Sequence, residues 1–170
     1  MTTTSPVEPV IAERPAQPYV AIRRLVTMQT MHEIADRIPD VFGWLGSRGV
    51  VPSGAPFLRY NLIDMEGELE VEAGVPVDAP VASDEPILAG VLPAGRYVTV
   101  RHCGHPDGLI DVTAAVLAWA ERRGLGWDVT DTERGQRWNC RLEIFRTDPR
   151  EQPDPNNWET DLAFRLADRP

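Results

Sequence analysis

One order of predicted elements, strand–helix–strand–strand, occurs twice in this chain of 170 residues. The two copies span about residues 19–77 and 87–166, and short segments align between them. WLGSRG, from Trp44, lies 75 positions before WAERRG, from Trp119, and ELEVEAGVPV lies 89 positions before NWETDLAFRL. A repeat constrains the architecture more than any single element does, because its units pack against one another. The order therefore predicts an internal duplication.

Hydrophobic periodicity and helix-breaking residues predict the elements of both copies. In the first copy, Thr30-x-x-Glu33 is a capping-box pattern that begins a helix, Pro39 kinks or restarts this helix, and Gly49 ends it. In the second copy, a helix is expected over residues 106–123. The strands are expected at residues 19–26, 58–65, 68–77, 87–102, 137–145 and 158–166.

One helix per copy, among strands, is typical of an α+β fold with a mostly antiparallel sheet. We expect two main helices and a ligand groove at the pseudo-twofold junction of the duplicated units, since ligands favour such junctions. Residues 1–18 carry four prolines and no periodicity, so they are expected to form a disordered tail. Residues 19–166 are expected to form a single ligand-binding domain.

The charge of the chain narrows the class of partner. Lys and Arg number 17 and Asp and Glu 26, which gives a net charge of −9. Direct binding to nucleic acid or to a membrane is not expected, because contacts with phosphate require a basic surface. The N-terminal segment lacks a basic region followed by an apolar one, so a cytoplasmic location is expected. Two cysteines are too few for a disulfide framework.

Motifs for metals, cofactors and nucleophilic catalysis are weak. His102, Cys103, His105 and Cys140 lack the spacing of a zinc site, and the segment HCGHP fits a turn that leads into a helix. The sequence carries no GxSxG motif and no glycine-rich phosphate loop with its lysine. Neither a metal nor a cofactor is predicted.

The expected strand at residues 137–145 carries the most informative acid. Its even positions, from Trp138 to Ile144, form an apolar face that is expected to pack beneath the helices. Its odd positions include Arg141, Glu143 and Phe145 on the other face. A carboxylate in the middle of a covered face is costly unless it has a partner, and such groups are often functional. The alternative is a solvated face on which Arg141 is the neighbour of Glu143.

Aromatic residues are numerous enough to surround such a carboxylate. Most are expected in the core, but a subset that faces Glu143 would form an aromatic cage that receives a lipophilic cation. Tyr60, on the matching strand of the first copy, is the expected partner of Glu143. The candidate ligand-binding residues are Glu143, Tyr60, Phe145, Tyr97, Trp119, Trp158 and Arg141.

Several short motifs, in this order along the chain, resemble those of the GyrI-like (AraC effector-binding) family. They are the segments FLRYNLID, RHCGHPDGL, WAERRG, LEIFRTDP and WETDLAFRL. The resemblance covers residues 19–166 and implies a duplicated unit whose central groove binds lipophilic, often cationic, small molecules. It also implies that Glu143 is the anionic centre of the groove. Phe145 stands where the family has a tyrosine, and Asp161 is the acid of the closing strand.

The resemblance leaves three functions open. The first is a standalone domain that captures a lipophilic cationic or aromatic compound, for sequestration or for sensing. The second is a cofactor-free hydrolase that opens reactive cyclopropane rings of genotoxic natural products, in which Glu143 activates water and Tyr60 or a tryptophan polarises the electrophile. The third is a protein-interaction module that acts on a DNA enzyme through an acidic strand edge. The residues of that expected edge are Glu66, Glu68, Glu70 and Glu72.

Overall fold

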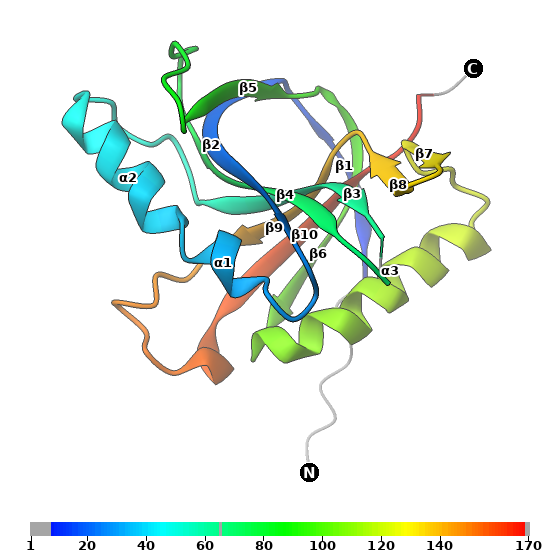
Figure 1. Ribbon diagram of the computed structural model, residues 1–170. Coiled ribbons are helices and arrows are strands. Elements are labelled where there is room, and N and C mark those ends of the chain that lie inside the picture. The colour runs from blue at the N-terminus through cyan, green and yellow to red at the C-terminus, as the bar shows by residue number, and fades with distance from the viewer. Residues whose placement is uncertain (1–7, 65, 169–170) are drawn as a thin grey trace.

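The computed structural model of the protein describes residues 8–64 and 66–168, which form a ten-stranded curled sheet (Figure 1). The strands are β1 (Val10–Arg14), β2 (Gln17–Val26), β3 (Phe57–Ile63), β4 (Leu69–Pro76), β5 (Leu88–Leu92), β6 (Gly95–Cys103), β7 (Val129–Thr132), β8 (Gly135–Trp138), β9 (Arg141–Phe145) and β10 (Glu159–Arg165). Their order is β1-β6-β10-β9-β3-β4-β2-β5, and the β7–β8 hairpin joins the sheet through β8 and β3. All described strand pairs are antiparallel, which confirms the predicted α+β class.

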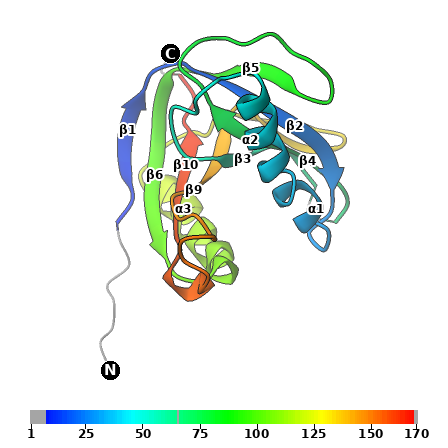
Figure 2. The ribbon, with the colours of Figure 1, turned by 90° about the vertical axis from the view of Figure 1, so that its left-hand side faces the viewer.

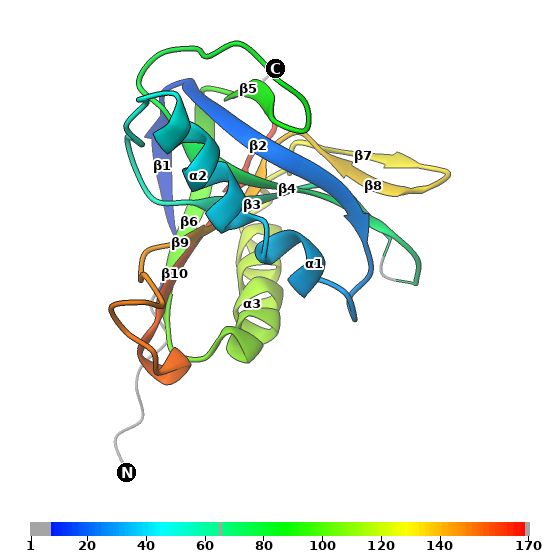
Figure 3. The same cartoon turned by 60° about the vertical axis from the view of Figure 1, so that its left-hand side comes forward.

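The helices of the described residues pack on one face of the sheet (Figure 3). They are α1 (His32–Ala35), α2 (Ile38–Ser47) and α3 (Leu109–Arg122), together with the 3₁₀ turns η1 (Pro106–Gly108) and η2 (Pro155–Asn157). The helices α1 and α2 contact β2 and β4, whereas α3 contacts β6. None of these helices is both long and apolar enough to cross a membrane.

Two apolar clusters, one on each face, form the core. The first cluster joins buried residues of all three α-helices, such as Ile34 and Val116, to sheet residues such as Leu58 and Leu162. The second cluster contains strand residues and no helix residue, and Leu142 and Ile144 belong to it. The helix-covered face of the sheet is therefore the face opposite to Leu142 and Ile144.

Both predicted helix ends are confirmed, and both use the same motif. Gly49 and Gly124 have φ values of 69° and 66°, a backbone conformation that glycine adopts without strain. The amide of Val50 donates to the carbonyl of Leu45 at 3.0 Å, and Leu125 donates to Ala120 at the same distance. These are the six-to-one hydrogen bonds of a Schellman motif.

The predicted start of the first helix needs a correction. Pro39 does restart the helix, since it is the second residue of α2. However, Thr30 does not cap α1: its hydroxyl accepts a hydrogen bond from the amide of Thr27 at 2.8 Å. The capping box is therefore absent, because the Thr30 side chain closes the preceding turn instead.

The predicted N-terminal tail is wrong for residues 10–18. Residues 10–14 form β1, which pairs antiparallel with β6, and Gln17 begins β2 (Figure 2). Pro9 and Pro15 flank β1, so this edge strand forms despite the proline content, and Pro18 lies inside β2, where it is the register partner of Val91 of β5. Residues 1–7 lie outside the described part of the chain.

Two expected strands are each divided in the structure. The strand at 87–102 is the pair β5 and β6, and the strand at 137–145 is the pair β8 and β9. The break at Asn139 and Cys140 shifts the alternation, so Trp138 lies in the first cluster while Leu142 lies in the second. The prediction that the even positions pack beneath the helices is therefore wrong for Leu142 and Ile144.

Candidate ligand-binding site

Glu143 lies in the centre of the sheet, on the face that the helices cover. On β9 it stands opposite Leu58 of β3 and Leu162 of β10, which are both buried. It alternates with Leu142 and Ile144, and the next residue on its own face, Phe145, packs against the first cluster. Its side chain is half-buried. Glu143 thus lies on a covered face, the setting in which a carboxylate is costly unless it has a partner.

Tyr60 donates a hydrogen bond from its hydroxyl to Oε1 of Glu143. Tyr60 lies on β3 and Glu143 on β9, and these two strands are neighbours in the sheet. Burial raises the pKa of the Glu143 carboxyl, and this effect is opposed by the hydrogen bond from Tyr60 and by the charge of Arg141. Burial, followed by the nearby Glu143, also raises the pKa of Tyr60.

Arg141 does not form an ion pair with Glu143. Its guanidinium carbon lies 4.8 Å from the ring centroid of Trp138 and 4.6 Å from that of Phe164, so the cation is stacked on aromatic rings. Burial lowers the pKa of Arg141, against the influence of Tyr60 and Glu143. Among the described residues, no cationic side chain lies within 4.0 Å of the Glu143 carboxylate.

The other predicted aromatic residues are spread over the molecule. Trp119 is buried in the first cluster, where Arg123 stacks on it at 4.1 Å from the ring centroid. Trp158 is half-buried and donates its indole N–H to the carbonyl of Gln152 at 2.6 Å. Tyr97 belongs to the second cluster and donates to the carbonyl of Pro93 at 2.6 Å. The structure thus places Tyr97 on the face opposite to Glu143.

Asp161 of the closing strand has partners of its own. Its carboxylate accepts hydrogen bonds from Nε of Arg101 at 2.8 Å and from Nε of Arg146 at 2.7 Å. Partial burial raises the pKa of Asp161, but the bonds from the two arginines outweigh it and lower the pKa below its ordinary value. Its register partner is Ile144, so it does not share a face with Glu143.

The expected acidic edge is wrong for Glu72. The strand β4 lies between β3 and β2 in the interior of the sheet, and Glu72 is only 6% exposed. Its Oε1 accepts a hydrogen bond from the hydroxyl of Tyr19, and its Oε2 accepts one from Nδ2 of Asn61. The alternation of Glu68, Glu70 and Glu72 predicted one solvated row, but β4 is buried on both faces from Val71 onward.

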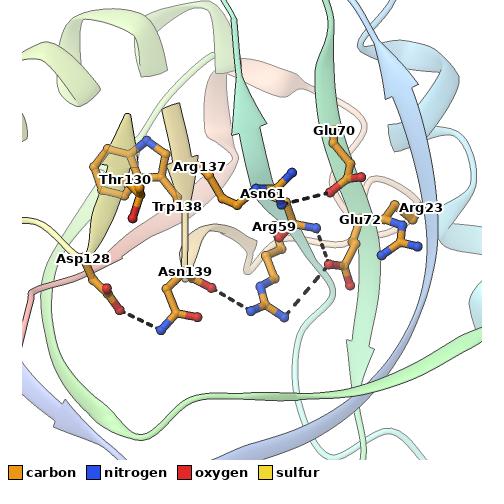
Figure 4. A pocket seen from close by; sticks show the side chains of 10 residues that line it. All are labelled: Arg23, Arg59, Asn61, Glu70, Glu72, Asp128, Thr130, Arg137, Trp138 and Asn139. Atoms are coloured by element: carbon orange, nitrogen blue, oxygen red, sulfur yellow. Dashed lines mark hydrogen bonds and ion pairs between the residues drawn. The ribbon is translucent and has the colours of Figure 1, made fainter. Parts of the chain in front are cut away.

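Two described cavities lie away from Glu143 and Tyr60. One, of about 380 Å³, opens beside Glu72 and is drawn in Figure 4. The other, of about 280 Å³, is lined by Ile22 and by Trp44 of α2. In the described chain, no three His, Cys, Asp or Glu side chains are grouped in a way that would hold a metal ion.

The chain belongs to the family of GyrI-like small molecule binding domains, whose pattern it matches over residues 7–167. No sequence among the curated proteins matches that of this chain. The resemblance inferred from the short motifs is confirmed, and with it the class of small-molecule binding domains.

Solved structures share the fold at low sequence identity. The C-terminal domain of EcmrR is 18% identical with a TM-score of 0.74, over 96% of this chain and 99% of that domain. In the complex of EcmrR with DNA, the chain spans 58% of the EcmrR chain. SAV2435 bound to tetraphenylphosphonium is 11% identical with a TM-score of 0.60, over 94% of each chain. A hydrolase from Listeria innocua is 15% identical with a TM-score of 0.57, over 96% of this chain and 94% of that one.

Proposed function

We propose that the protein captures lipophilic cationic or aromatic compounds on the helix-covered face of the sheet, with Glu143 as the anionic centre. The observation that carries the proposal is the state of Glu143, a half-buried carboxylate that Tyr60 holds and no described cation neutralises. Coulomb attraction is strong in such a partly desolvated site. A ligand cation would supply the missing charge, and aromatic contacts would supply hydrophobic affinity.

The arrangement of the sheet supports a groove at this position. The strands β6, β10 and β9 of the second half mirror β2, β4 and β3 of the first, so β9 and β3 meet in the middle. Glu143 and Tyr60 project from these two strands, between the part of the sheet that α1 and α2 contact and the part that α3 contacts. This symmetry supports a duplicated unit, and the proposed groove lies at the junction of its two copies.

Tetraphenylphosphonium is the probe of choice, because the fold neighbour SAV2435 has been solved with it. Titration of the protein, followed by tryptophan fluorescence, is expected to give saturable quenching, and mass spectrometry is expected to recover the cation unchanged. The variant Glu133→Gln controls for net charge, because Glu133 is exposed in the β7–β8 turn. Absence of saturable quenching in both the wild type and Glu133→Gln would contradict the proposal.

A hydrolase is the second candidate, favoured by the raised pKa of Glu143. A carboxylate whose pKa is closer to neutrality is a better general base, and the Tyr60 hydroxyl is placed beside it to donate a hydrogen bond. Incubation with an electrophilic cyclopropane compound discriminates the two functions. Hydrolysis adds the mass of one water to the compound, and Glu143→Ala is expected to abolish this gain in mass. If the compound is recovered intact, binding is the only one of the two functions that remains.

A further inference from the structure

The cavity of about 380 Å³ is lined by Arg59 (Figure 4). Arg59 is the register partner of Leu142, and its neighbour Leu58 is that of Glu143, so the cavity lies on the face of the sheet opposite to Glu143. Arg59 of β3 and Arg23 of β2 are register partners of Glu72, so all three project to this face. Arg137 of β8 lines the same cavity. Three guanidinium groups from three strands therefore converge here, in a protein whose net charge is −9.

Each acid of this cavity already has a partner. Glu72 accepts from Tyr19 and Asn61. Asp128 accepts from Nη1 of the buried Arg165 at 2.7 Å and from Nδ2 of Asn139 at 2.7 Å. The third acid, Glu70, lies with Oε2 at 3.9 Å from Nη1 of Arg137.

Arg59 and Arg23 keep free donors, whereas Arg137 is the ion-pair partner of Glu70. Arg59 donates from Nη1 to the hydroxyl of Tyr19 at 2.6 Å and from Nη2 to the carbonyl of Asn139 at 2.7 Å. Its nearest carboxylate oxygen, on Glu72, is 4.0 Å away, and its buried Nε–H has no partner in the described structure. Arg23 is exposed and, among the described residues, lies in no ion pair. An arginine has five N–H donors that suit carboxylate and phosphate oxygens.

We propose that this cavity, lined by Arg23, Arg59 and Arg137, is a second binding site, selective for small oxyanions such as carboxylates or phosphate. The neutral donors that surround Glu72, and the pairing of Asp128 with Arg165, limit the repulsion that an anion would meet. The site shares no residue with the Glu143 site and lies on the other face, so it stands independently of the proposed function.

Titration of the protein with inorganic phosphate and, separately, with glutarate tests the site by NMR of the backbone amides. We expect saturable shifts that cluster at residues 23, 59, 61, 137 and 139. Saturation by only one of the two probes would support the site and identify its oxyanion as phosphate or carboxylate. Absence of saturation with both probes would overturn the proposal.

Arg23→Gln is the decisive variant, because Arg23 is exposed and its loss leaves the buried network intact. It is expected to weaken the affinity for the saturating anion at least threefold. Arg24→Gln is the matched control, since Arg24 is the next residue of the same strand and points to the opposite face. Equal weakening by both variants would indicate a nonspecific effect of net charge and overturn the site. Arg23→Gln is not expected to alter binding at Glu143, because Arg23 projects to the other face of the sheet, so the two proposals fail separately.

Discussion

Tyr60 of β3 donates a hydrogen bond to Glu143 of β9 across the two strands that meet in the middle of the sheet. The bond holds a carboxylate in place on the face that the helices cover. Burial works against its ionisation, while the Tyr60 hydroxyl and the charge of Arg141 favour it. The balance of these influences controls the ionisation of Glu143, on which the predictions for fold stability and for the proposed cation binding depend.

Glu143→Gln is expected to stabilise the fold at neutral pH. Because burial raises the pKa of Glu143 in the folded state, protonation stabilises the fold below the ordinary glutamate pKa, and this contribution is lost as the pH rises through the folded-state pKa. The variant should melt about 2–4 °C above the wild type at pH 8, for a gain of roughly 1 kcal/mol. The difference should shrink as the pH falls towards 4.5. A variant that melts at a lower temperature than wild type at pH 8 would contradict the unfavourable burial of this charge.

Binding of tetraphenylphosphonium is expected to weaken as the pH falls, because protonation removes the charge of Glu143. The midpoint should lie above the ordinary pKa of a glutamate. Tyr60→Phe should move the midpoint further upward, since the phenol no longer stabilises the carboxylate. Fluorescence titrations between pH 4 and pH 8 give the midpoints. An unchanged midpoint in Tyr60→Phe would show that the bond does not control the ionisation.

Arg141→Gln is expected to raise the affinity for cations, because its positive charge lies close to Glu143. Removal of that charge should strengthen binding of tetraphenylphosphonium about two- to fivefold at pH 8. The fold should lose roughly 1–2 kcal/mol, since the guanidinium stacks on Trp138 and Phe164. Calorimetry measures the first effect and thermal unfolding the second. A fall in affinity would contradict this prediction and would indicate that the charge of Arg141 is needed to keep Glu143 ionised.

Gly74→Ala is expected to destabilise the fold by about 1–3 kcal/mol, because overpacking a core is costly. A Cβ atom at Gly74 would lie 2.5 Å from Cζ of Phe57, a buried ring. Gly46→Ala in α2 is the matched control: nothing lies within 4 Å of its added Cβ atom, so the higher helix propensity of alanine should stabilise it by roughly 0.5–1 kcal/mol. Urea unfolding measures the free energy of unfolding of both variants. Equal changes in the two variants would contradict the tight packing of Phe57 against Gly74.

Residues that restrict the backbone locally, such as proline and glycine, predicted the positions of the helix ends correctly. Pro39 lies in the first turn of α2, and Gly49 and Gly124 end their helices with positive φ. The pairing of Glu143 with Tyr60 followed from the order of the repeated elements, although it joins residues 83 positions apart.

Features that depend on the path of the sheet were not predictable from periodicity. The break at Asn139 shifts the alternation between β8 and β9, and this reverses which face of β9 meets the helices. The alternation of Glu72 with apolar residues predicts a solvated side chain. In the curled sheet it is buried, and its donors Tyr19 and Asn61 come from other strands. The burial of an acid whose partners come from other strands cannot be predicted from the local sequence pattern.

The most direct test of the account compares a cation with a neutral analogue of similar shape. Tetraphenylphosphonium and triphenylphosphine oxide should be titrated, by tryptophan fluorescence at pH 8, into wild type, Glu143→Gln and the control Glu133→Gln. The account predicts that Glu143→Gln weakens binding of the cation by about 1–2 kcal/mol, roughly 5–30-fold, and leaves binding of the neutral compound unchanged. Equal losses for both compounds, or no loss for the cation, would contradict Glu143 as the anionic centre.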